Sequence, residues 1–505
     1  MTNMNKTINE HSWIPLIVVA LASFIIALDA TFMNVSISQL VADLNTEVST
    51  VQTIMSFYTL ITAAFMLLSA KLQDIVGKKK LFLIGAVLYG IGTMIAAISS
   101  SAEILFIGWA VIEGIAGALM LPATVSIVSG TYSGEKRTIS LAIVGVMGAF
   151  ASAIGPLFGG VMTTFLSWRY GFACELIIVI LILVLQNRIP HFEPTESKSE
   201  LDISGAIISF IGLILLVIGI LSLTHDFNTS IAVIILGMAV LATFAWFELR
   251  RKRNGKVPLL DIELFKDRNL RVGTAIMILC YLIMEGGLFA VSLYLQSVLK
   301  LNAFNTGLTI LPLTIGLLIF ATLAPALSEK LSHKKIMAIG SIMSIIGCLI
   351  LSYQFRLDTS PLEFIPGMFI LGAGFGFIMG LSVDISLTNV PDESQNNASG
   401  VTSTGESLGE SMGTAIIGII LILGVFGGIS NAVDIYAPEY SDNETFQIEV
   451  FDSFEKMDTV NGVEVDILNT IIQEAMAFVM IVTAILMAIV FVLILRLKDM
   501  KIENK

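Results

Sequence analysis

Long apolar stretches constrain this chain more than any other feature of its sequence. A helix of about 20 mostly apolar residues spans the roughly 30 Å hydrocarbon core of a bilayer, and the backbone must be helical there because lipid offers it no hydrogen-bond partners. Stretches of this kind lie near residues 14–36, 50–70, 80–99, 103–129, 138–162, 168–188, 203–224, 230–249, 272–297, 304–327, 334–353, 361–389, 398–427 and 470–496. The sequence therefore predicts an all-α integral membrane protein with fourteen transmembrane helices.

Composition supports the membrane class and argues against a soluble enzyme. Of the 505 residues, 55% are hydrophobic and 13% are charged, whereas a soluble protein carries about 25% charged residues. The mean hydropathy is +0.88. Cys174, Cys280 and Cys348 lie in apolar runs without the spacing of metal ligands, so we expect them to be core residues. We expect no metal, no cofactor and no enzymatic activity.

Lysine and arginine indicate which loops face the cytoplasm, because cytoplasmic loops retain positive charge. With an even number of helices, both termini and every second loop share one side, and that side holds 24 of the 28 basic residues. The polar segment 1–12 is not followed by a signal-peptide cleavage site, so we expect the first apolar run to be retained as a helix. We therefore expect a multi-pass protein of a prokaryotic cytoplasmic membrane, with both termini in the cytoplasm.

The longest predicted connection, 428–472, is acidic and lies outside in this topology. It holds ten aspartates and glutamates against the single Lys456, and it contributes to the net charge of −12. It can act as a solubilising loop, or as a lid or vestibule whose negative field concentrates cations. Alternating apolar and polar residues at 444–451 predict a short strand within it.

A short pattern occurs twice and indicates a duplicated architecture. The segments 70–80 and 325–335 keep a leucine, an acid and a terminal pair of lysines in register. They follow the second and tenth predicted helices, which are equivalent if six-helix bundles begin at helices one and nine. We therefore predict an N-terminal bundle (1–190), a segment with two inserted transmembrane helices (191–271) and a C-terminal bundle (272–505). Two bundles that meet at a central site are the expected layout for alternating access.

Acidic residues inside the predicted membrane helices are the strongest functional signal. Each costs about 2.5 to 3.5 kcal/mol at the centre of an inserted helix, so such acids usually face a wet cavity and carry ions, protons or substrate. The interior acids are Asp29, Glu113, Glu175, Glu285, Glu406 and Glu410. We expect them to gather in one aqueous pocket between the bundles. Asp384, near the cytoplasmic end of the twelfth helix, is expected to be an entry or interfacial acid.

Glu406 and Glu410 form the densest pair of these acids. Residues four apart share one face of a helix, and Thr402 and Thr414 continue this face. Two carboxylates one turn apart repel when both are ionised, so we expect one of them to exchange protons. The alternative is that both glutamates are hydrogen-bonded fillers of a wet helix interface.

Asp29 is the first candidate for a proton or cation site. It lies about fifteen residues into the first helix, roughly 22 Å from the cytoplasmic end, and hence in the outer half of the membrane. Alternatively, Thr31 and Asn34 hold its carboxylate for packing. The same two interpretations, functional and structural, apply to Glu113 and Glu285.

Short motifs stand out from the apolar background. They are LDATFMNV at 28–35, LQD at 72–74 with GKKK at 77–80, GP at 155–156 with GG at 159–160, and WR at 168–169. Together they resemble the major facilitator superfamily, and in particular its fourteen-span drug:proton antiporters. The resemblance implies two six-helix bundles plus two inserted helices, and transport driven by the proton gradient.

Departures from that family's pattern all make the membrane interior more negative. The fourth-helix motif usually has an arginine three residues before a Gln-Gly pair, and here those positions read Ala110 and Glu113. The sixth helix has Glu175 in place of the usual asparagine. In the thirteenth helix, Glu406 and Glu410 replace an arginine and a glycine. The chain thus resembles the acid-rich exporters of quaternary ammonium compounds and other lipophilic cations.

The resemblance also implies residues that control the conformation. These are Asp74, Gly77, Lys78, Gly155, Pro156 and Gly159. We expect Asp74 at the start of the third helix, where an acid interacts favourably with the helix dipole, in a loop that stabilises the outward-open state. We expect Pro156 to kink the fifth helix.

These observations predict a proton-coupled antiporter that exports lipophilic cationic drugs or antiseptics by alternating access. The residues expected to couple protons or cations are Asp29, Glu113, Glu406 and Glu410. The residues expected to bind substrate are Glu175, Glu285, Glu406, Glu410 and Asp384. We expect lipophilic cations, protons and the bilayer as partners, no nucleic acid, and a monomer.

Two other functions compete with this prediction. One is a proton-coupled exporter of metal–tetracycline complexes or alkali cations, and the other is a membrane sensor, which would need a signalling domain that we do not expect. The sequence has no phosphate-binding loop of the Gly-Lys-Ser type, so we expect the proton gradient rather than ATP to supply the energy.

Overall fold

Helices account for all the regular structure in the part of the chain that the computed structural model describes. That part comprises residues 12–194, 202–223, 227–256, 258–328, 330–390, 395–436 and 465–498. Fourteen of its helical spans are long and apolar enough to cross a membrane. The predicted all-α membrane fold and the predicted number of transmembrane helices are therefore confirmed.

The first six membrane spans pack around one another. They are α2 (Ile14–Phe32), α4 (Val48–Val76), α5 (Lys78–Ala97), the composite span α6 (Ala102–Leu105), η2 (Phe106–Glu113) and α7 (Gly114–Thr131), α8 (Gly134–Phe165) and α9 (Arg169–Val184). The short helices η1 (Met33–Val35) and α3 (Ile37–Leu44) follow α2, and η3 (Leu185–Arg188) follows α9. Helix α2 lies against α8, and α5 lies against α7 and α9. Buried apolar side chains such as Val19, Phe82 and Met120 fill the space between them.

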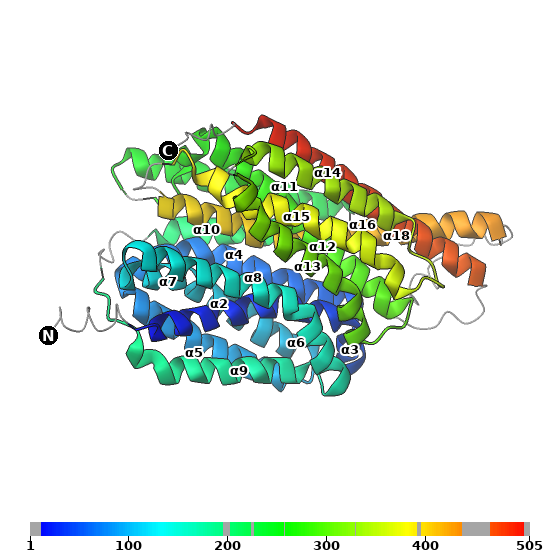
Figure 1. Ribbon diagram of the computed structural model, residues 1–505, viewed down its shortest axis with the longest axis horizontal. Coiled ribbons are helices and arrows are strands. Elements are labelled where there is room, and N and C mark those ends of the chain that lie inside the picture. Colours follow the sequence, from blue (N-terminus) through cyan, green and yellow to red (C-terminus); the bar gives the residue numbers. More distant parts are fainter. Residues whose placement is uncertain are drawn as a thin grey trace.

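The last six membrane spans form a second group. They are α12 (Arg268–Ser297), α13 (Ala303–Ser328), α14 (His333–Ser352), α15 (Phe364–Leu387) preceded by η6 (Pro361–Glu363), α16 (Gln395–Tyr436) and α18 (Val465–Arg496). Helices α13 and α14 pack on α15, and α12 and α18 pack on α16. Figure 1 shows the blue to cyan helices of the first group along one side of the molecule and α12 to α18 along the other. We call the two groups the N-terminal and C-terminal bundles; the exact residue boundaries of the domains stay a prediction.

The inserted pair consists of α10 (Ile203–Leu221) and α11 (Phe227–Arg253), followed by the short helix η5 (Ile262–Lys266). Helix α10 packs on α4 of the N-terminal bundle and on α16 of the C-terminal bundle. The rings of Phe65 in α4 and Phe210 in α10 meet edge to face at 5.1 Å. The pair therefore flanks the α4–α16 contact between the bundles.

The bundles contact each other at the end where α2, α8, α12 and α16 finish. We call this the distal end and the opposite one, where α2 begins, the proximal end; α3 marks the distal end in Figure 1. Across the interface, the backbone N–H of Ser38 donates to Gln296 Oε1 at 2.9 Å, and Gln52 Nε2 donates to the carbonyl oxygen of Thr414 at 2.7 Å. One continuous apolar core includes side chains from α3, α12 and α16.

The glycines of helix α8 have different surroundings at its two ends. Towards the distal end, a Cβ on Gly159 would collide with the carbonyl oxygen of Phe32, and Gly160 lies against the backbone of Phe304. Towards the proximal end, a Cβ on Gly145 would have no neighbour within 4 Å. Helix α8 therefore lies close to both α2 and α13 towards the distal end, and towards the proximal end its Val144 packs in the apolar core of the N-terminal bundle.

The predicted position of Asp74 is wrong. Helix α4 continues to Val76 and α5 begins at Lys78, so Asp74 lies in the last turn of α4 rather than at the start of the third span. The C-terminal end of a helix carries the negative end of its dipole, so the predicted favourable interaction does not apply there.

The predicted outer loop 428–472 is partly helical. Helix α16 continues to Tyr436 and α18 begins at Val465, so both helices extend into the predicted loop. The strand predicted at 444–451 lies outside the described residues.

We expect Gly159→Ala to destabilise the protein and Gly145→Ala, on the same helix, to leave it as stable as the parent chain or more so. Alanine favours a helix over glycine by about 1 kcal/mol at either position, but only at Gly159 does the added methyl group meet a backbone carbonyl, that of Phe32. Overpacking of this kind costs about 1 to 3 kcal/mol. Thermal unfolding in detergent should give a lower melting temperature for Gly159→Ala. Equal melting temperatures for the two variants would contradict the close contact of α2 with α8.

Candidate functional site

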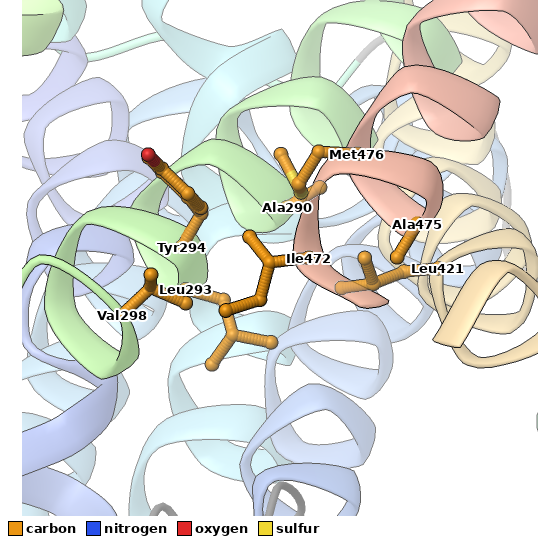
Figure 2. A pocket seen from close by; sticks show the side chains of 8 residues that line it. All are labelled: Ala290, Leu293, Tyr294, Val298, Leu421, Ile472, Ala475 and Met476. Atoms are coloured by element: carbon orange, nitrogen blue, oxygen red, sulfur yellow. The ribbon is translucent and has the colours of Figure 1, made fainter. Parts of the chain in front are cut away.

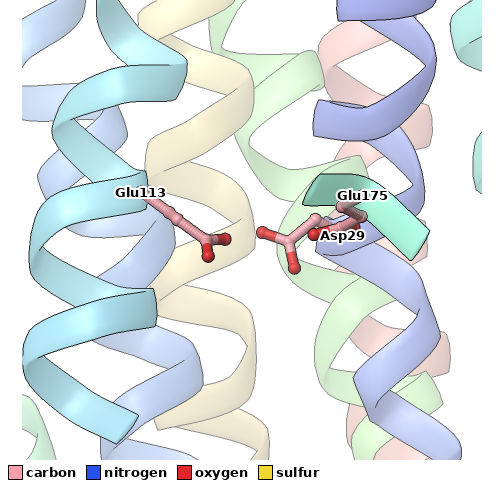
Figure 3. Close-up of side chains that lie close together, drawn as sticks. All are labelled: Asp29, Glu113 and Glu175. Carbon is pink, nitrogen blue, oxygen red and sulfur yellow. The ribbon is translucent and has the colours of Figure 1, made fainter. Parts of the chain in front are cut away.

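Three acidic side chains from three helical segments meet inside the N-terminal bundle. Asp29, Glu113 and Glu175 each place one carboxylate oxygen within 4.8 Å of those of the other two. Figure 3 shows the three side chains pointing toward one another. All three are 0% exposed. We call them the N-terminal carboxylate group.

The local fold brings these residues together. Asp29 lies in the last turn of α2, Glu175 lies in α9, and Glu113 is the last residue of η2, which is wound as a π-helix. Wide helical turns of this kind are frequent at functional sites. Gly92 of α5 leaves room for the glutamate, because a Cβ on Gly92 would lie 2.6 Å from Glu113 Cγ.

Few hydrogen bonds satisfy these carboxylates. Trp109 Nε1 donates to Asp29 Oδ2 at 2.9 Å, and Thr93 Oγ1 donates to Glu175 Oε2 at 3.2 Å. The second oxygen of Asp29, the second oxygen of Glu175 and both oxygens of Glu113 have no hydrogen-bond partner among the described residues. Within that part of the chain, no basic side chain forms an ion pair with any of the three.

Aromatic side chains enclose this group. Trp109 stacks on Tyr58, with ring centroids 5.5 Å apart, and meets the ring of Phe172 edge to face at 5.9 Å. Tyr89 of α5 is buried beside them. We did not predict a role for Trp109, although it precedes Glu113 by four residues, the spacing at which side chains of a helix lie close together.

The chemistry of the N-terminal carboxylate group follows from its enclosure. A buried carboxylate without a partner is costly when it is ionised, and three side by side also repel one another. The group is therefore suited to bind what neutralises it. Protons can do so, and a small hard cation is the other candidate, since carboxylate oxygens are its preferred ligands.

A second group of acids lies in the C-terminal bundle. Glu285 and Tyr281 belong to α12, and Glu406 and Glu410 belong to α16. The charges of Glu285 and Glu406 both act on Glu410, and all three carboxylates act on Tyr281. Glu285 is 6% exposed, whereas Glu406 and Glu410 are half-buried. We call the three acids the C-terminal carboxylate group.

Glycines set the position of the two α16 glutamates. A Cβ on Gly409 would collide with the carbonyl oxygen of Ile278, and a Cβ on Gly413 would collide with that of Leu282. Such small residues let membrane helices approach closely. The glutamates of α16 lie on the face next to this glycine stripe, so they are held beside α12. Neither forms a hydrogen bond or ion pair with another described residue, and the alternative prediction of hydrogen-bonded fillers therefore gains no support.

The six acids thus form two groups, one in each bundle, and the prediction of one shared pocket is wrong. Asn34 of η1 contacts the C-terminal group across the bundle interface, with its Nδ2 3.5 Å from Glu285 Oε2. Thr31 donates to backbone carbonyls of its own helix. The alternative in which Thr31 and Asn34 hold Asp29 is therefore also wrong.

Asp384 lies apart from both groups. Its Oδ2 is 2.9 Å from His333 Nε2, and its side chain is 69% exposed. The structure therefore places it on a different part of the C-terminal bundle, against the start of α14, and not beside Glu285, Glu406 or Glu410.

The residues predicted to control the conformation fall into two places. Gly77 connects α4 and α5 with a φ of 96°, which favours glycine, and the Nζ of Lys78 lies 5.8 Å from the centre of the Phe192 ring. The side chain of Asp74 lies outside the part of the chain that the structure describes. Gly155 and Gly159 face the end of α2, and the carbonyl of Pro156 faces Gly307 of α13.

A small apolar pocket lies near the distal end, between α12, α16 and α18 (Figure 2). Its lining includes Leu293, Leu421 and Met476, and its volume is about 10 Å³. A volume of this size holds about one water molecule. It contains none of the acids and is too small to bind a drug.

Comparison with known proteins gives the family. The family model of the Major Facilitator Superfamily matches residues 19–414. The chain is 26% identical over 411 residues to the multidrug efflux pump LfrA of Mycolicibacterium smegmatis, an alignment that covers 81% of each chain. It is 29% identical over 397 residues to the quinolone resistance protein NorB of Staphylococcus aureus, with 78% of this chain and 83% of that protein covered.

A third relative and a solved structure are also similar to this chain. The tetracenomycin C resistance and export protein of Streptomyces glaucescens is 27% identical over 415 residues, with 81% of this chain and 76% of that protein covered. The crystal structure of a bacterial homolog of the human lysosomal transporter Spinster, in an inward-facing and occupied conformation, superimposes with a TM-score of 0.64 at 12% identity, with 95% of each chain covered. The family match over most of the chain and the shared fold lead to one conclusion: this chain is a membrane transporter of the Major Facilitator Superfamily and not an enzyme.

Proposed function

We propose that this chain is a proton-coupled antiporter that exports lipophilic cationic drugs or antiseptics. One observation carries the proposal. On each side of the bundle interface, three membrane-embedded carboxylates lie together without a basic partner among the described residues. Acids in such positions serve ions, protons or charged substrates.

The comparisons support export. LfrA is a multidrug efflux pump, and the tetracenomycin C protein is a resistance and export protein. The sequences are 26% and 27% identical to this chain, so the direction of transport is inferred from them by similarity.

Charge in the loops supports an orientation with the proximal end in the cytoplasm. Basic residues such as Lys79, Lys136 and Lys334 lie at that end, as expected for cytoplasmic loops. In this orientation the hydrogen bonds of Ser38 and Gln52 that join the bundles lie in the outer half of the membrane. The arrangement then corresponds to an inward-facing state, in which a drug enters from the cytoplasm or the inner leaflet.

Competition between ligands supplies the coupling. A proton and a cationic drug both stabilise the neutralised carboxylates, so binding of one weakens binding of the other, and this reciprocity is a property of any linked pair of sites. Alternating access then needs the bundles to part at the distal end, where α8 and α13 touch through Gly160 and Gly307. Close glycine contacts let such an interface form and separate without large side chains to repack.

We expect Asp29→Asn to abolish drug uptake driven by a pH gradient. The amide keeps the size of the side chain but cannot give up a proton, so the proton step is lost. The measurement is accumulation of ethidium in everted membrane vesicles that are acidified inside. Glu47→Gln, at an exposed position at the start of α4, is the matched control and should transport normally. Full transport by Asp29→Asn would remove Asp29 from the mechanism.

The spacing of the N-terminal carboxylates keeps one alternative open, since three carboxylate oxygens within 4.8 Å of one another could also hold a metal ion. An exporter of metal–tetracycline or alkali cations would use such a site directly. We expect ethidium to release protons from acidified everted vesicles that contain the wild-type protein, and tetracycline with Mg²⁺, or Na⁺ or K⁺ alone, to release none. A response to the metal complex or to an alkali cation, with none to ethidium, would refute the multidrug proposal.

A further inference from the structure

We infer that the two carboxylate groups have separate tasks: the N-terminal group exchanges protons only, and the C-terminal group receives the positive charge of the drug. The inference rests on the proposed function and extends it, because the sequence assigned Glu406 and Glu410 to both tasks and Glu175 to substrate. Three features of the structure carry it: the enclosure of one group, the openness of the other, and a contact that connects them.

The N-terminal carboxylate group is closed to anything of drug size. Asp29, Glu113 and Glu175 have no exposed surface, and the space around Glu113 is so tight that Gly92 cannot carry a side chain. Trp109 is 2% exposed and covers Asp29 through its hydrogen bond. A proton can reach such a site along a few ordered groups, whereas a polycyclic cation would have to displace the aromatic wall.

The titratable groups that face the N-terminal carboxylate group offer no positive charge. They are Tyr58 of α4, Tyr89 of α5 and Cys174 of α9. These side chains are neutral when protonated and negative otherwise. Protons are therefore the neutralising partner that the local chemistry supplies, and four carboxylate oxygens without a hydrogen-bond partner among the described residues are available to carry them.

The C-terminal carboxylate group is accessible by comparison. Glu406, Glu410, Tyr281 and Met284 are all half-buried, and a Cβ on Gly287 would have no neighbour within 4 Å. A tyrosine ring attracts an organic cation through its π-face, and a methionine side chain adapts to apolar surfaces of different shape. Carboxylates beside such residues suit a lipophilic cation.

The two groups are connected through the end of α2. Asp29 lies in the last turn of α2, and η1 follows directly, carrying Asn34 to within 3.5 Å of Glu285 Oε2. The backbone carbonyl of Asn34 also accepts a hydrogen bond from Gln296 Nε2 at 3.4 Å. A change in the position of the end of α2 on protonation of Asp29 would therefore reach Glu285 through Asn34.

Two transport assays in proteoliposomes separate the tasks. The first is counterflow, in which labelled ethidium exchanges for unlabelled ethidium without a pH gradient, and the second is accumulation driven by a pH gradient. An amide in the N-terminal group mimics the protonated acid, so Asp29→Asn, Glu113→Gln and Glu175→Gln should lose gradient-driven accumulation. They should retain counterflow, because exchange of labelled for unlabelled ethidium needs no change of protonation. Glu406→Gln and Glu410→Gln should lose about tenfold or more in ethidium affinity and fail in both assays.

The outcomes are distinguishable. Loss of counterflow in the three N-terminal variants, with folded protein confirmed by size-exclusion chromatography and by normal behaviour of Glu47→Gln, would overturn the division of tasks. Unimpaired ethidium affinity in both Glu406→Gln and Glu410→Gln would overturn it as well. If the wild-type protein transports no ethidium at all, the proposed function fails instead.

The fluorescence of Trp109 offers a readout that does not depend on transport. The indole of Trp109 donates to Asp29, so its fluorescence should change with pH as this group is protonated. The Trp109 signal is the pH-dependent fluorescence that the wild-type protein shows and Trp109→Phe lacks. We expect this signal to disappear in Asp29→Asn and to persist in Glu406→Gln, whether or not the variant transports drug. A signal that persists in Asp29→Asn and disappears in Glu406→Gln would contradict the inference.

Discussion

The structure depends on the cost of placing a carboxylate where water cannot reach it. Asp29, Glu113 and Glu175 are enclosed in the N-terminal bundle with two hydrogen-bond donors, Trp109 and Thr93, for six oxygens. Leaving such groups ionised and unpaired is expensive, and pairing them with a lysine or arginine would remove their use for transport. A site that lacks its own counter-charge must obtain one from outside, and this requirement connects the chemistry of the acids to the movement of the bundles.

Contacts between the bundles decide where that movement can occur. They include contacts at the distal end, where Ser38 meets Gln296 and Gln52 meets Thr414. These distal contacts are hydrogen bonds and glycine packing, without an ion pair among the described residues that join the bundles. Each such hydrogen bond contributes about 1 kcal/mol. Burying an ionised carboxylate without a partner costs more than this, so neutralising it can shift the balance between two arrangements of the interface.

Much of the fold was predictable and part of the site was not. Apolar length and basic loops identify every membrane span, because burial in lipid leaves few alternatives to a helix. The spacing of Glu406 and Glu410 correctly placed them on one face of α16. The sequence placed Asp29 and Glu113 in the same bundle but could not show that their side chains meet, because a helical pattern gives the face of each helix but not its neighbours. The mistaken position of Asp74 has a similar cause, since a polar segment between two apolar ones does not show where a helix ends.

The central claim is that binding of a cationic drug is linked to release of protons from the membrane-embedded carboxylates. Its most direct test is the number of protons released when ethidium binds to the purified protein in weakly buffered detergent solution, followed with a pH indicator. The account predicts net release of protons when ethidium binds, because two ligands that weaken each other's binding must displace each other. Saturable binding of ethidium without any proton release, at several pH values between pH 6 and pH 8, would contradict it.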